Sequence, residues 1–229
     1  MKKIHVVGAA LLVSLLGAIT TAQAAVITST LGNSAPGFND GDTPPVFLVG
    51  GAQGGQPAPF DQSYGTDGLF GGNFSAAWTH SYGAIADTIL SATITFGIVD
   101  HDSAASGSQL AGFSFEGANL TAPLDLMFEA AGEGADAQYD IYSLVLPNIT
   151  FAGLADGLAA GALSLQGPGL VPNIFTGGVD ETSTNGANLI FSTLQITTRE
   201  TQQVPEPSTL AISLLGLGAL GWRQRRRRV

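Results

Sequence analysis

The sequence contains no cysteine among its 229 residues. This absence excludes disulfide bonds, thiol catalysis and metal sites built on cysteine. Residues 25–203 must therefore fold without cross-links, and they are numerous enough to form one domain with a sizeable hydrophobic core.

Basic residues are nearly absent between the two ends of the chain. Of the 8 Lys and Arg, two follow Met1, five follow Trp222 and only Arg199 lies between them. Of the 18 acidic residues only Glu206 lies beyond residue 203, so residues 25–203 hold 17 acids against one base, a net charge of −16. Such a surface repels phosphate groups, which excludes nucleic-acid binding and phosphoryl transfer. It attracts divalent cations and cationic partners.

Long amphipathic helical patterns are also missing, and period-two alternation takes their place. Along Ile89–Val99 one face carries apolar residues, namely Leu90, Ala92, Ile94, Phe96 and Ile98. This alternation is typical of a half-buried strand. Further strands are predicted at Phe74–Tyr82, Gln109–Phe115, Leu124–Phe128, Ala137–Leu146, Gly161–Gln166 and Asn188–Thr198, the last with Ile190, Leu194 and Ile196 on one face. The pattern predicts an all-β protein, a single antiparallel β-sandwich with jelly-roll-like connectivity.

The start of this domain has a different composition. Glycine, proline, Asp and Asn recur every few residues from Ala35 to Gly72, which is typical of loops. We expect residues 25–72 to form an irregular lead-in around the sheet, with a short edge strand at Val46–Val49. Gly153–Gly161 contains three glycines and could form either a helical turn or a loop.

The N-terminus has the pattern of a signal peptide. Lys2 and Lys3 precede an apolar run from Val6 to Ile19, and Ala22 and Ala24 supply the small residues that signal peptidase requires. We predict a signal helix over residues 1–24, with cleavage after Ala24 and export of the remaining chain from Ala25 onward.

The C-terminus, residues 204–229, combines three features in order. Val204-Pro205-Glu206-Pro207 is extended because its prolines disfavour helix and central strand. The uncharged run Leu210–Trp222 comes next, and it ends at a cluster of Arg223, Arg225, Arg226, Arg227 and Arg228. Thirteen helical residues span about 20 Å, less than the roughly 30 Å of a hydrocarbon core. We therefore expect a short transmembrane helix that anchors the chain transiently, with the arginines on the cytoplasmic side.

This order of features resembles the PEP-CTERM sorting signal of Gram-negative bacteria. The resemblance covers about the last tenth of the chain. It implies that an exosortase, a membrane-embedded protease, recognises the box Pro205-Glu206-Pro207 and removes the tail during export. It also implies a role at the cell surface or in the exopolysaccharide matrix of biofilms, with signal peptidase and exosortase as processing partners. A simple tail anchor behind a proline-rich linker is the alternative.

Asp100 and Asp102 are the candidate metal ligands. They lie directly after the strand Ile89–Val99 at i and i+2, and hard carboxylate oxygens are what calcium prefers. Calcium is therefore the one cofactor that the sequence suggests. An ordinary polar turn is the alternative, and His101 between them is interpreted as a loop histidine.

Trp78 and Tyr82 are the candidate ligand-binding aromatics. Four residues apart on one strand, they lie on the same face, where they would stack on sugar rings if exposed and join the core if buried. Catalysis has little support, because there is no Gly-x-Ser-x-Gly elbow and no acid in a strongly apolar, aromatic stretch. The sequence thus predicts an exported surface or matrix protein without enzymatic activity. The alternative is a secreted calcium-dependent carbohydrate-binding module.

Overall fold

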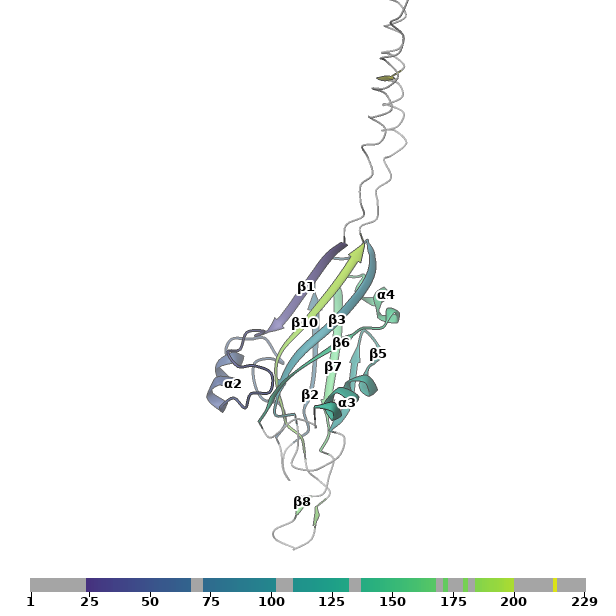
Figure 1. Cartoon of the computed structure of the whole chain (residues 1–229). Helices are drawn as coiled ribbons and strands as arrows, with labels where there is room; N and C mark the ends of the chain where they lie inside the picture. Colours follow the sequence, from purple (N-terminus) through teal and green to yellow (C-terminus); the bar gives the residue numbers. More distant parts are fainter. Residues whose placement is uncertain are drawn as a thin grey trace, which may run out of the picture. The chain divides into compact units, whose positions relative to one another are not determined.

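Two four-stranded antiparallel sheets dominate the computed structural model (Figure 1). It describes residues 24–66, 72–101, 109–131, 137–167 and 184–199, together with the short stretches 171–172, 179–180 and 216–217. Residues Ala24–Arg199 form a compact unit. The predicted signal helix and nearly all of the predicted tail helix lie outside the described residues. Within the described residues, no helix combines the length and the apolar character that crossing a membrane requires.

The first sheet has the strand order β1-β10-β3-β6. Its strands are β1 (Ala24–Gly32), β10 (Asn188–Arg199), β3 (Thr88–Val99) and β6 (Tyr139–Val145). The second sheet has the order β2-β7-β4-β5. Its strands are β2 (Ser75–Ser81), β7 (Leu158–Leu165), β4 (Leu110–Phe115) and β5 (Ala118–Asn119). A separate pair joins β8 (Val171–Pro172) to β9 (Val179–Asp180).

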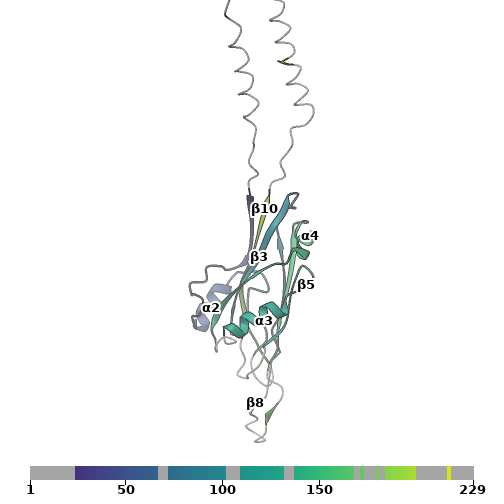
Figure 2. The ribbon, with the colours of Figure 1, turned by 45° about the vertical axis from the view of Figure 1, so that its right-hand side comes forward.

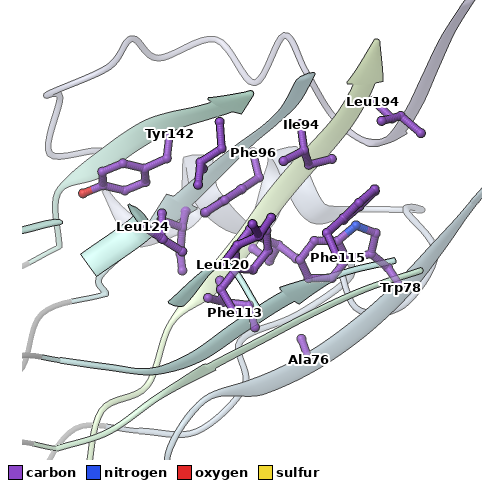
Figure 3. Packing of buried hydrophobic residues seen from close by; sticks show 14 of the residues in the cluster. Ala76, Trp78, Ile94, Phe96, Phe113, Phe115, Leu120, Leu124, Tyr142 and Leu194 are labelled. Carbon is purple, nitrogen blue, oxygen red and sulfur yellow. The ribbon is translucent and has the colours of Figure 1, made fainter. Parts of the chain in front are cut away.

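The inner faces of the two sheets share one hydrophobic core. Phe96 of the first sheet lies 5.6 Å, ring to ring, from Phe113 of the second. Trp78, Phe115 and Leu194 belong to the same cluster, and Figure 3 shows these side chains between the strands. The predicted all-β class with antiparallel sheets is confirmed, because alternating apolar residues from both sheets meet at this core.

Two β-bulges change the alternation that the sequence suggested. Ser91 pairs with Thr197 and Ile89 with Thr198, so Leu90 is an extra residue, and its side chain is 43 % exposed instead of facing the core. Ile190 is likewise extra, since Leu189 pairs with Ile98 and Phe191 with Gly97. Ile190 therefore packs on the opposite face from Leu194 and Ile196, and the prediction that the three share a face was wrong.

The lead-in is more ordered than expected. The strand β1 was not predicted, and the predicted edge strand at Val46–Val49 is wrong, because these residues begin the helix α2 (Val46–Gln53). The carbonyl of Pro45 accepts hydrogen bonds from the backbone of Leu48 and Val49, which starts the helical turn. Val49 and Ala52 then pack with Ile190 and Phe191 in a second apolar cluster, on the outer face of the first sheet.

The predicted strand Leu124–Phe128 is also wrong. These residues belong to the helix α3 (Thr121–Ala130), which buries Leu124 and Phe128, four residues apart, and leaves Leu126 69 % exposed. Pro123 is tolerated because it lies in the first helical turn. The short helices η1 (Asn148–Thr150) and α4 (Phe151–Leu154) precede β7, which begins three residues before its predicted start. Figure 1 shows α2 to one side of the strands and α3 and α4 to the other, and in the turned view of Figure 2 α3 lies in front of the strands.

Candidate functional site

Asp100, the first candidate calcium ligand, closes a turn at the end of β3. Its φ is 61°, a left-handed conformation that Asp tolerates better than most residues. Its backbone donates to the carbonyl of Gln138 at 2.9 Å, and its Oδ1 accepts from the backbone of Ala137 at 3.0 Å. Asp102 lies outside the described residues. Among the residues that the structure describes, no three His, Asp or Glu side chains gather closely enough to hold a metal ion, so the calcium site stays a prediction.

His101 follows β3 outside any helix or strand, and it is buried, with 1 % of its surface exposed. Its Nε2 lies 3.1 Å from Oδ2 of Asp140 and 2.9 Å from the hydroxyl of Tyr142. The ring packs against Phe128 of α3 in a tilted arrangement, with a centroid distance of 4.5 Å and an interplanar angle of 32°. The helix α3, where a strand was predicted, thus covers one side of the His101 ring.

Asn185 connects the same region to the second sheet. Its side-chain nitrogen donates to the carbonyl of His101 at 2.9 Å and to Oε1 of Gln109 at 2.8 Å. Its backbone nitrogen donates to Oδ1 of Asn73 at 2.8 Å. These residues come from four separate parts of the sequence, so no local motif could have revealed the cluster. His101, Gln109 and Asn185 are buried, and the hydrogen bonds of Asn185 are those of a polar network that fixes the packing at one end of the sheets.

His80 occupies a second buried position, between β2 and the first sheet. Its Nδ1 lies 3.2 Å from the hydroxyl of Ser29 on β1, and its Nε2 lies 3.0 Å from the hydroxyl of Ser192 on β10. Burial lowers the pKa of His80 to about 4. The imidazole is therefore neutral at pH 7 and joins the two sheets by hydrogen bonds.

Trp78 and Tyr82 share a face, as predicted, but that face is the core. Trp78 is 5 % exposed and packs with Phe60 and Phe115, so its indole does not form a stacking surface for a sugar. Tyr82 is half-buried and donates its hydroxyl to the carbonyl of Leu154 at 2.9 Å. Burial, with the negative charges of Glu116 and Asp156, raises the pKa of Tyr82 to about 12. The alternative stated for this pair, membership of the core, fits these positions.

The outer face of the second sheet carries a shallow depression of about 380 Å³. Hydroxyl-bearing and small side chains line most of it, among them Ser75, Ser114, Thr121, Ala162 and Ser164. A neighbouring hollow of about 310 Å³ shares Ser114, Gly117 and Ala162 with it. Neither hollow has an ionisable side chain in its lining. This surface can offer hydrogen bonds to a neutral polar ligand but no charged group.

The sorting residues lie mostly outside the described part of the chain. Those outside it are Ala22, Val204, Pro205, Glu206 and Pro207, together with the arginines from Arg223 to Arg228. Ala24 is described. It is exposed, begins β1 and pairs with Arg199, so the predicted cleavage after Ala24 would remove only the first residue of that strand.

Comparison with models of known families decides the nature of the tail. Residues 203–228 match the PEP-CTERM protein-sorting motif. The chain carries a PEP-CTERM sorting motif. Comparison with curated proteins gave no match, and comparison with solved structures also gave none.

The PEP-CTERM motif confirms the resemblance noted in the sequence. It contains the box Pro205-Glu206-Pro207, the apolar run and the arginine cluster. The motif implies an exosortase as processing partner and membrane-associated sorting to the cell surface. The motif covers only residues 203–228, so it bears on the sorting of the protein and not on the role of Ala24–Arg199.

Proposed function

We propose that this protein is an exported, non-catalytic component of the cell surface or of the exopolysaccharide matrix. The observation that carries the proposal is the PEP-CTERM motif at residues 203–228, directly after a compact β-domain. Signal peptidase cuts after Ala24, the apolar run Leu210–Trp222 holds the chain in the inner membrane, and exosortase then removes the tail. The domain is the part delivered.

Three features of the domain support a role without catalysis. His101 is enclosed by Phe128, Tyr142 and Asp140, so a substrate could reach it only after local opening. His80 is fully buried between two serine hydroxyls. The hollows on the second sheet are lined by side chains that cannot act as acid or base near neutral pH.

The strand order supports jelly-roll connectivity for the domain. The chain passes from one sheet to the other at β1 to β2, β2 to β3 and β3 to β4. After β5 the chain enters the first sheet as β6, the second sheet as β7 and the first sheet again as β10. β6 pairs with β3. β7 lies between β2 and β4, and β10 lies between β1 and β3. Eight strands wound in this way form two interlocked Greek keys.

The proposal is tested by replacing the box with alanine in the triple variant Pro205→Ala, Glu206→Ala, Pro207→Ala, with Gln202→Ala as the matched control outside the motif. Intact mass is measured for the protein from the cytosol, the membranes and the cell exterior. We expect the native chain and the control outside the inner membrane, starting at Ala25 and shortened near the box. The triple variant should remain membrane-bound with its tail. A native chain found intact from Met1 to Val229 in the cytosol would refute the proposal.

The second candidate is a secreted calcium-dependent carbohydrate-binding module. The hydroxyl-lined depression on the second sheet favours it, because sugar hydroxyls pair with Ser and Thr side chains. Ala162→Gln would fill the depression, and Ser143→Gln, on the first sheet, is the control. Loss of glycan-array binding in Ala162→Gln alone, together with loss on chelation of calcium, would favour this candidate over the first.

A further inference from the structure

The strand β1 is the edge of the first sheet. It pairs with β10 in continuous register from Ala24 to Gly32, and no other described strand pairs with it. Asn33 extends the ladder by donating to the carbonyl of Ile190 at 2.9 Å. Because residues of an antiparallel strand alternate in the side to which they hydrogen-bond, Val26, Thr28 and Thr30 direct their backbone groups away from β10. They present a row of donors and acceptors at the open edge.

The opposite edge of the same sheet is covered. Gly41 donates to the carbonyl of Tyr139 at 2.8 Å, and Tyr139 donates to the carbonyl of Asp42 at 2.8 Å. Ile141 donates to Oδ1 of Asp40 at 2.7 Å. The lead-in thus occupies the backbone groups at the start of β6. The edge strand β5 of the second sheet is only two residues long.

The open edge lacks the devices that usually prevent strands from pairing between molecules. β1 reads Ala-Ala-Val-Ile-Thr-Ser-Thr-Leu-Gly, without a charge, a proline or a bulge. Charged residues, prolines and bulges are how natural proteins block such edges. The neighbouring edge strand β2 is also free of Asp, Glu, Lys and Arg. In residues 25–203, whose net charge is −16, this side therefore presents no strand carboxylate to repel a second copy.

We propose that β1 pairs with β1 of a second copy of this chain, which joins the two first sheets into one of eight strands. The pairing is antiparallel about a two-fold axis, as is usual for dimers of identical chains. A register centred on Thr28, with residues 25–31 of the two exported chains overlapping, places Thr28 opposite Thr28 of the second copy and Val26 opposite its Thr30. Ile27 and Leu31, which are partly buried against the core, lose further exposed surface.

This inference rests on the proposed function, because export to the cell surface is what brings many copies of the chain together. Sorting through the membrane confines all copies to one surface, which raises their effective concentration. Pairing along β1 would then link the exported domains of neighbouring molecules.

The absence of cysteine from the native chain gives a direct test. Thr28→Cys is compared with Ser143→Cys, which lies exposed on β6 of the same sheet. Residues paired across an antiparallel ladder have Cα atoms about 5.5 Å apart, within the range that a disulfide spans. We expect the exported Thr28→Cys protein, after mild oxidation, to migrate mainly as a covalent dimer on non-reducing gels, and Ser143→Cys as a monomer. Equal cross-linking of both variants, or none of Thr28→Cys, would overturn the proposal.

A second measurement does not depend on cross-linking. Sedimentation of the exported protein should give a dimer for the native chain and for Ser143→Lys, and a monomer for Thr28→Lys, because two lysines opposite each other repel. Circular dichroism checks that each variant is folded. A native monomer at the cell surface would overturn the pairing and leave the proposed function intact. A native dimer confined to the cytosol would overturn the proposed function and leave the pairing along β1 intact.

Discussion

His80 illustrates how one buried residue sets a pH limit on this fold. Burial lowers its pKa from 6.5 to about 4 in the folded chain. Between these pH values the unfolded chain binds a proton that the folded chain excludes, so stability falls as the pH is lowered through this window. The loss amounts to on the order of 3 kcal/mol of unfolding free energy. The neutral imidazole between Ser29 and Ser192 is what the acid disrupts.

The measurement is urea unfolding of the native chain and of His80→Gln from pH 7 to pH 5. We expect the variant to be less stable at pH 7 and to lose less stability than the native chain as the pH falls. Titration of the carboxylates is common to both proteins, so the difference between the two slopes isolates His80. Parallel slopes would show that His80 does not control this pH dependence.

Gly97 is the residue where the outer face of the first sheet leaves no room for a side chain. A Cβ at this position would collide with the hydroxyl of Tyr139 and lie 2.6 Å from Cε1 of Phe191. We expect Gly97→Ala to lower the unfolding free energy by about 1 to 3 kcal/mol, the usual effect of overpacking. Gly50→Ala in α2 is the control, because a Cβ there meets nothing within 4 Å. The control should be neutral or stabilising by up to about 1 kcal/mol. Equal effects in urea unfolding would contradict the packing described.

At the scale of elements, α3 provides the sharpest contrast between the predicted strand and the observed helix. In a strand, Leu124, Leu126 and Phe128 would share one face, but in α3 only Leu124 and Phe128 are buried. We expect Phe128→Ala to cost about 3 to 5 kcal/mol and Leu126→Ala to stay within about 0.5 kcal/mol of the native chain. Thermal or urea unfolding of both variants gives the answer. A large loss of unfolding free energy in Leu126→Ala would favour the predicted strand Leu124–Phe128 over the helix α3.

The strands that were predicted correctly are those in which apolar and polar residues alternate over many consecutive positions. Ile94, Phe96 and Ile98 repeat with period two, and β3 forms where this pattern lies. The helices α2 and α3 were not predicted because a short run of apolar residues fits the period of a strand as well as that of a helix. Packing against Phe191 stabilises the helical form of α2, and packing against Tyr142 stabilises that of α3. The bulges at Leu90 and Ile190 depend on pairing between distant strands, which one sequence does not reveal.

The candidate sites divide in the same way. The sorting tail was predictable because its three features adjoin in the sequence, and the PEP-CTERM match covers all of them. The cluster of His101, Asp140 and Asn185 was not, since the fold alone brings these residues together. The burial of Trp78 could not be predicted, because a spacing of four residues places two aromatics on one face of a strand whether that face is exposed or lies in the core.

At the scale of the whole molecule, the charge of the exported domain is the property that solution conditions change most. Residues 25–203 carry a net charge of −16, so the folded state concentrates like charges that the unfolded chain spreads apart. Raising the salt from 10 mM to 150 mM shortens the screening length from about 30 Å to about 8 Å. We expect the unfolding free energy to rise by on the order of 1 kcal/mol, the interaction of two close unit charges in water.

Comparing NaCl, MgCl₂ and CaCl₂ at equal ionic strength separates screening from specific binding. Screening alone gives three equal increases. A calcium site adds about 2.7 kcal/mol at a calcium concentration one hundred times its dissociation constant, and Asp100→Asn should abolish that addition if Asp100 is a ligand. Asp100 already uses Oδ1 to hold the backbone of Ala137, so the same variant also loses the turn at every salt. Only the loss that appears with calcium and not with sodium or magnesium bears on the calcium-dependent alternative, whereas stability that is unchanged or falls with all three salts would contradict the role given to net charge.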